Sequence, residues 1–131
     1  MSIELQVLGW SGVLWVVLLG VAGTAANRQL GTGYLMGPRD EGRTLSGRPA
    51  RLERALKNHG EGLLLFTVAV LVVSLGERTG PLTQLCAWVY LAARIAYAPA
   101  YAYGWTPWRT VFWAVGFLAT LVMLLRGLLP L

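Results

Sequence analysis

The sequence predicts an all-α integral membrane protein, built as a bundle of four transmembrane helices. Of the 131 residues, 56% are hydrophobic and only 13% are charged, and the mean hydropathy is +0.57. Soluble domains carry about 25% charged residues, so this composition excludes an ordinary water-soluble domain. Four apolar stretches follow one another, each near the length of about 20 residues that a spanning helix needs. We expect one domain over residues 1–131, with helices at about 3–27, 50–76, 81–103 and 107–128.

The first predicted span contains the run from Val7 to Ala26, which carries no charged residue. At 1.5 Å per residue this run can cross a hydrocarbon core of about 30 Å. The alternative is a cleaved secretory signal peptide, because small residues end the run. Such peptides begin with a positively charged region, whereas the first charged residue of this chain is the acidic Glu4. We therefore favour a membrane span.

Residues 27–49 are predicted to form a polar connection, because their glycines and prolines are too dense for a continuous helix. Seven of the eleven basic residues of the chain lie between Asn27 and Asn58. Under the positive-inside rule this connection is cytoplasmic. With four spans, both termini and the turn at Glu77 and Arg78 then face the opposite side. The seven residues are Arg28, Arg39, Arg43, Arg48, Arg51, Arg54 and Lys57.

The other three predicted helices each have a recognisable start or end. The second follows Pro49, is charged only in its first half and ends at Gly76. The third begins at Pro81, a residue that suits the first turn of a helix, and its single charge is Arg94. The fourth begins after the turn at residues 104–107 and ends near Arg126.

Polar residues from all four helices are expected to gather at the cytoplasmic side. The second and third helices each carry three of them at spacings that place them on one helix face. One arginine lies at the end of the first helix and another at the start of the fourth, both at the same level of the membrane as these residues. The residues are Arg28; Arg54, Asn58 and Glu61; Arg94, Tyr97 and Tyr101; and Arg109.

These residues also have structural interpretations. Arg28 and Arg109 can be interfacial side chains that reach out to water. Glu61 and Arg94 lie in apolar stretches, where a charge costs about 2.5 to 3.5 kcal/mol, so a structural ion pair between them is one alternative. His59 lies on a different helix face and is interpreted as an interface or packing residue.

The cluster has the composition of a binding site for an anion. With the neighbouring residues of the second helix included, the basic residues outnumber the carboxylates, which suits an anionic ligand that also offers a donor to a carboxylate. The basic residues are Arg28, Arg54, Lys57, Arg94 and Arg109, and the carboxylates are Glu53 and Glu61. The sequence shows no metal-ligand set, no serine, histidine and acid arrangement and no phosphate-binding loop, and it predicts no nucleic-acid partner. A bound thiol fits the remaining chemistry, because a guanidinium or a phenol favours the more reactive thiolate. Arg109 and Tyr101 are the candidate donors to that sulfur.

Two segments resemble motifs of the MAPEG family, the membrane-associated proteins in eicosanoid and glutathione metabolism. The run Arg54-Ala55-Leu56-Lys57-Asn58-His59-Gly60-Glu61 is similar to the family's Arg-x-x-x-Asn-x-x-Glu motif. The segment from Ala93 to Tyr101 resembles its second motif. The likeness covers nearly the whole chain and is stronger to the bacterial branch than to the prostaglandin or leukotriene synthases, so it implies no eicosanoid substrate.

The resemblance implies a single MAPEG-like four-helix domain, assembled as a homotrimer that binds glutathione between neighbouring subunits near the cytosolic side. It gives glutathione-binding roles to six residues, thiolate stabilisation to Arg109 and a basic contact to Arg28. The localisation that follows is a bacterial inner membrane. Two functions remain open: a transferase or peroxidase that uses glutathione as co-substrate on a lipophilic molecule arriving from the bilayer, and a non-catalytic membrane protein whose polar cluster is structural. The six residues are Arg54, Asn58, Glu61, Arg94, Tyr97 and Tyr101.

Overall fold

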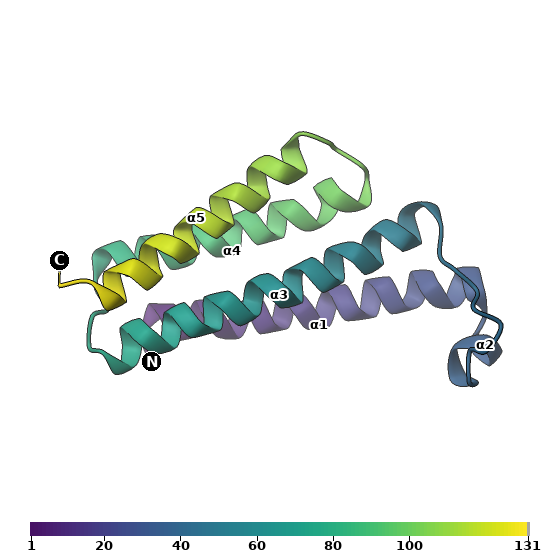
Figure 1. The fold of residues 1–131 in the computed structure, drawn as a ribbon, viewed down its shortest axis with the longest axis horizontal. Coiled ribbons are helices and arrows are strands. Elements are labelled where there is room, and N and C mark those ends of the chain that lie inside the picture. The colour runs from purple at the N-terminus through teal and green to yellow at the C-terminus, as the bar shows by residue number, and fades with distance from the viewer. Residues whose placement is uncertain (131) are drawn as a thin grey trace.

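The computed structural model describes residues 1–130, and the regular secondary structure of this part of the chain is entirely helical. The all-α expectation is therefore confirmed. The N-terminus, the α3–α4 turn and the end of α5 lie at one end of the molecule (Figure 1). The connection that contains α2 and the α4–α5 turn lie at the other end, which we call the loop end. The helices are α1 (Ile3–Leu30), α2 (Thr32–Met36), α3 (Gly47–Leu75), α4 (Pro81–Ala102) and α5 (Trp108–Leu128).

The first connection is shorter and more ordered than the sequence predicts. Helix α1 continues three residues past the expected end and stops at Gly31, where φ is +93°. The short α2 follows at once, in a stretch that the density of glycines argued against. Helix α3 begins at Gly47 because Gln29 pairs with the backbone of Ser46, accepting from its N–H at 2.8 Å and donating to its carbonyl at 3.2 Å. This pairing between the end of α1 and the start of α3 is a long-range contact that composition does not reveal.

Three of the helices in the described part of the chain, α1, α3 and α5, are long and apolar enough to cross a membrane. Helix α4 has 22 residues but is not among them. Half of its residues are buried, a larger share than in any other long helix. Because α4 faces protein more than its surroundings, it tolerates the tyrosines and the arginine that lower its hydropathy.

The core lies where α3, α4 and α5 meet. Phe66 of α3 stacks on Tyr90 of α4 with ring centroids 3.9 Å apart, and Met123 of α5 is fully buried beside them. Helix α5 approaches α3 so closely that a β-carbon on Gly127 would lie 2.6 Å from Val72. Many large apolar side chains on the outer faces remain exposed, such as Leu64 at 70%. Exposure on this scale is typical of a surface that faces lipid.

Glu4 closes the bundle at the end opposite the loop end. Its side chain is completely buried, and one carboxylate oxygen accepts a hydrogen bond of 3.2 Å from the hydroxyl of Thr83. The same hydroxyl oxygen accepts from the N–H of Gly80, so it caps the start of α4. The first turn of α1 is thereby joined to the first turn of α4.

Candidate functional site

Arg94 forms the centre of a buried polar network between α3 and α4. It is only 3% exposed, and its Nη1 donates to the side-chain oxygen of Asn58 at 3.0 Å. Its Nε donates to Nδ1 of His59 at 3.3 Å, and its guanidinium lies 4.4 Å from the centre of the Tyr97 ring. The structure thus brings together three of the predicted residues, Asn58, Arg94 and Tyr97.

His59 is the member of this network that the sequence interpretation missed. The side chain is 1% exposed and its Nε2 lies 3.2 Å from the carbonyl oxygen of Ser11 on α1. Because an arginine Nε can only donate, Nδ1 accepts from Arg94 and Nε2 carries the proton that it donates to Ser11. One neutral histidine thus links α1, α3 and α4. A face assignment within α3 alone cannot show this, because both partners lie on other helices.

Tyr101 is held between two arginines at the loop end of α4. Arg54 of α3 donates from Nε to the Tyr101 hydroxyl oxygen at 3.1 Å. Arg109 of α5 lies over the Tyr101 ring, 4.8 Å from its centre, as expected for a cation–π contact. Because its oxygen accepts from Arg54, the Tyr101 hydroxyl can still donate its own proton to a ligand.

A cavity of about 240 Å³ opens beside these groups, and we call it the α4–α5 cavity. The side chain of Arg109 is half-buried and forms no hydrogen bond with a described residue, so its donors are available to a ligand. None of Arg54, Arg94 and Arg109 forms an ion pair with a described carboxylate. An excess of positive charge therefore surrounds the cavity. It is lined by Asn58, Tyr97, Tyr101, Arg109, Thr110 and Trp113.

Two residues of the predicted set do not join this cluster within one chain. Glu61 is exposed and forms neither a hydrogen bond nor an ion pair with a described residue. The structural ion pair between Glu61 and Arg94 is therefore not formed, because Arg94 is turned inward to Asn58 and His59. Arg28 is exposed on α1 and lines a different hollow, which includes Val21.

The buried Nη2 atom of Arg94 has no hydrogen-bond partner, and neither does the buried hydroxyl of Tyr90. A β-carbon on Gly62 would lie 3.8 Å from the Arg94 guanidinium and 3.9 Å from that hydroxyl. Gly62 of α3 therefore lies directly against both groups. Buried donors without partners are uncommon, so these atoms mark a place where water or a ligand atom is expected.

The fold and this cluster define a multi-pass helical membrane protein with a basic, tyrosine-lined site between three of its helices. The model of the MAPEG family matches residues 7–129, which is nearly the whole chain. The protein belongs to the MAPEG family. None of the curated proteins compared with the chain matches its sequence.

Proposed function

We propose that this protein is a membrane-bound glutathione transferase or peroxidase that acts on lipophilic electrophiles or hydroperoxides. The observation that carries the proposal is the position of Arg109 and Tyr101 side by side at the α4–α5 cavity, with donors available to a ligand. Family membership supports the proposal, because the MAPEG family includes such enzymes as well as non-catalytic members.

The charges around the cavity fit glutathione as co-substrate. The three arginines of the cluster lack carboxylate partners in the described chain, and glutathione brings two carboxylates. Glutathione also brings an ammonium group, and Glu61 is an unpaired carboxylate two turns along α3 from Arg54. Binding would therefore neutralise groups that carry unpaired charge in the isolated chain, which is favourable in a partly desolvated site.

Arg109 and Tyr101 would then activate the ligand's thiol. A guanidinium N–H and a phenol O–H directed at sulfur favour the thiolate, because a charge-assisted hydrogen bond is stronger than a neutral one. In a transferase the sulfur electron pair forms a bond to an electrophilic carbon, and the leaving group departs with its own pair. In a peroxidase the thiolate attacks the terminal oxygen of the hydroperoxide, the O–O bond breaks, and the alkoxide takes a proton and leaves as the alcohol. A second glutathione thiol then reacts with the resulting sulfenic acid to give the disulfide and water.

We further propose that the protein is a homotrimer whose sites lie at subunit boundaries. Arg28 lies outside the cluster of its own chain, so it can contact the same ligand only from a second copy. If α4, which its neighbours shield, also crosses the membrane, then α1, α3, α4 and α5 together make four membrane spans. We propose that the loop end and the site face the cytoplasm, with both termini opposite, in a bacterial inner membrane, because basic connections favour the cytoplasmic side.

The second candidate function is a non-catalytic membrane protein in which the cluster is structural. One observation favours it: Arg94 satisfies two of its donors inside the protein, with Asn58 and His59. Residues of this network join α3 to α4 and, through Ser11, to α1. Under this alternative the Arg109 donors remain directed at water.

A binding experiment on the detergent-solubilised protein separates the two functions. We expect saturable glutathione binding that is weakened by Arg54→Ala and by Glu61→Gln, measured by calorimetry. Each substitution removes a charged contact, so the affinity should fall by about tenfold. Arg78→Ala, in the turn at the opposite end, is the control and should bind like the parent protein. No binding at millimolar glutathione would favour the non-catalytic alternative.

Mixed oligomers test whether the site is shared between chains. We expect Arg28→Ala and Arg109→Ala chains to lack thiolate formation separately and to recover part of it when co-expressed. If each site takes Arg28 from one chain and Arg109 from its neighbour, random mixing restores about a quarter of the sites. The readout is the ultraviolet absorbance of the bound thiolate. Proteins assembled separately and then mixed are the control, and recovery that is absent in both mixtures argues against a shared site.

A further inference from the structure

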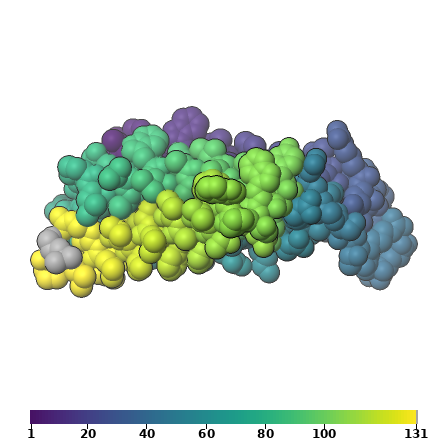
Figure 2. Space-filling view, turned by 90° about the horizontal axis from the view of Figure 1, so that it is seen from above, coloured from purple at the N-terminus to yellow at the C-terminus, as the bar shows by residue number. Residues whose placement is uncertain are grey.

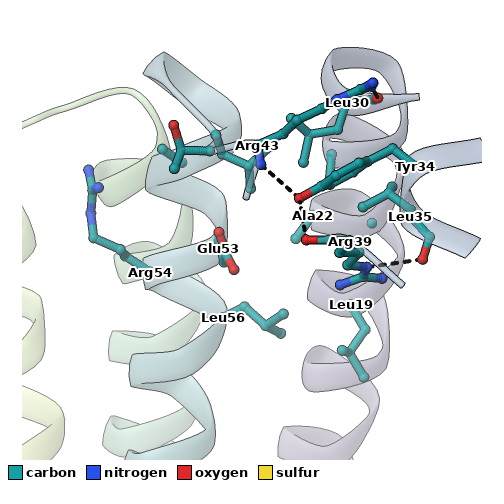
Figure 3. A pocket seen from close by; sticks show the side chains of 15 residues that line it. Leu19, Ala22, Leu30, Tyr34, Leu35, Arg39, Arg43, Glu53, Arg54 and Leu56 are labelled. Carbon is teal, nitrogen blue, oxygen red and sulfur yellow. Dashed lines mark hydrogen bonds between the residues drawn. The ribbon is translucent and has the colours of Figure 1, made fainter. Parts of the chain in front are cut away.

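A second and larger cavity lies between α1 and α3 at the loop end (Figure 3). Its volume is about 710 Å³, and we call it the α1–α3 cavity. Such a volume is typical of small-molecule sites, which span about 300 to 1,000 Å³. Of the residues that line it, only Arg54 belongs to the proposed glutathione site, and its side chain binds Tyr101.

The floor of the α1–α3 cavity is apolar. Leu19, Ala22 and Ala26 form it from α1, and Leu56 closes it from α3. These α1 residues belong to a helix that is apolar enough to span a membrane. The α2 connection projects at the loop end beyond the α4–α5 turn, so the mouth lies at the polar end of the bundle (Figure 2). The cavity therefore extends from the apolar part of α1 to the polar loop end of the bundle.

One side of the mouth is basic and is built by Tyr34 of α2. The Tyr34 hydroxyl accepts from the N–H of Arg43 at 2.8 Å and donates to the carbonyl of Arg39 at 3.3 Å. The backbones of both arginines are thereby held beside the cavity. The Arg43 guanidinium lies over the Tyr34 ring at 4.7 Å, forms an ion pair with Glu41 at 2.7 Å and donates to the carbonyl of Leu30. Arg39 uses only Nε, which donates to the carbonyl of Leu35. Its two terminal nitrogens have no partner among the described residues and remain available to an anion.

The opposite side of the mouth is acidic. Glu53 projects from α3 toward α1, whereas the neighbouring Arg54 points away toward α4 and binds Tyr101 (Figure 3). Glu53 is exposed and forms no hydrogen bond or ion pair with a described residue. A purely anionic ligand would be attracted by Arg39 and repelled by Glu53. A headgroup that carries both an anion and a hydrogen-bonding cation satisfies both sides.

We propose that the α1–α3 cavity binds an aminophospholipid, that is, a lipid whose headgroup joins a phosphate to a primary ammonium. The phosphate contacts the unpartnered terminal nitrogens of Arg39, the ammonium donates to Glu53, and an acyl chain lies along the apolar floor between α1 and α3. Basic pockets between helices at the cytoplasmic level are established places for lipid phosphates. The added carboxylate supplies selectivity, because a quaternary ammonium has no N–H to donate to it.

The test is native mass spectrometry of the delipidated full chain, titrated with dioleoyl lipids that differ only in headgroup. We expect phosphatidylethanolamine to bind about tenfold more tightly than phosphatidylcholine or phosphatidylglycerol. Glu53→Gln should remove this preference without weakening phosphatidylcholine, whereas Glu77→Gln, in the turn at the opposite end, is the matched control and should keep it. Arg39→Gln should weaken all three lipids.

A cavity-filling variant checks the location of the lipid. A β-carbon on Gly23 meets no atom within 4 Å, so Gly23→Leu should fold normally while occupying the α1–α3 cavity, and all three lipids should lose affinity. Equal binding of phosphatidylethanolamine and phosphatidylcholine would overturn the proposal, as would tighter binding of phosphatidylglycerol. Displacement of the lipid by soluble ethanolamine phosphate at the same concentration would assign the site to the free headgroup instead.

Discussion

Replacing Arg109 with alanine should greatly reduce thiolate formation by bound glutathione while the affinity for glutathione falls much less. The reason is that the contact from Arg109 to sulfur strengthens as the thiol ionises, so it contributes more to the reacting state than to binding. A hydrogen bond to a charged group contributes about 1.5 to 3 kcal/mol, which corresponds to about one to two pKa units of the bound thiol. Turnover should fall by about 10- to 100-fold.

The measurement is the ultraviolet absorbance of the bound thiolate, followed against pH in the parent protein and in the Arg109→Ala and Tyr101→Phe variants. Tyr101→Phe keeps the ring beneath Arg109 and removes only the hydroxyl, so it separates the phenol from the cation–π contact. Arg78→Ala is the control at the opposite end of the bundle. An apparent thiol pKa equal to that of free glutathione in the parent protein and both variants would contradict activation and favour the non-catalytic alternative.

The sequence predicts the position of Tyr101 and Arg109 because helical spacing and the order of the helices are sufficient to determine it. Tyr97 and Tyr101 share a face of α4, and the short turn after α4 brings Arg109 to the same level. The end of α3 and the start of α4 are also predictable, since Gly76 follows the last residue of α3 and Pro81 begins α4. Both results depend on residues near one another in the chain.

The sequence places polar residues at the same level of the bundle but does not predict which of them contact one another across helices, and this explains the errors. Arg94 was paired with Glu61 as an alternative because both are charged residues within apolar stretches. In the structure Arg94 points into the bundle, where it donates to Asn58 and His59, while Glu61 lies on the exposed side of α3. The α2 helix was missed for a similar reason, because its stability depends on the contacts of Tyr34 with the loop that follows.

Replacing His59 with leucine should lower the free energy of unfolding by about 2 to 4 kcal/mol, because it leaves the buried Arg94 Nε–H and the Ser11 carbonyl without their partner. The expected loss is large because burying a charged arginine donor without a hydrogen-bond partner costs more free energy than burying an unpaired neutral group. Unfolding can be followed by tryptophan fluorescence in mixed detergent micelles, since the chain has six tryptophans. Lys57→Leu, on the exposed side of α3, is the control and should change stability by less than about 0.5 kcal/mol.

The double variant shows whether the effect comes from the contact with Arg94 or from the packing of the ring. If it comes from the contact, His59→Leu should cost less than about 1 kcal/mol when Arg94 is already methionine, because no buried guanidinium is then left unpaired. Losses that simply add would mean that His59 acts only as a packing residue, as the sequence alone suggested. A positive coupling would instead establish His59 as the residue that fixes Arg94 against α3 and sets the position of the guanidinium beside Tyr97 at the wall of the α4–α5 cavity.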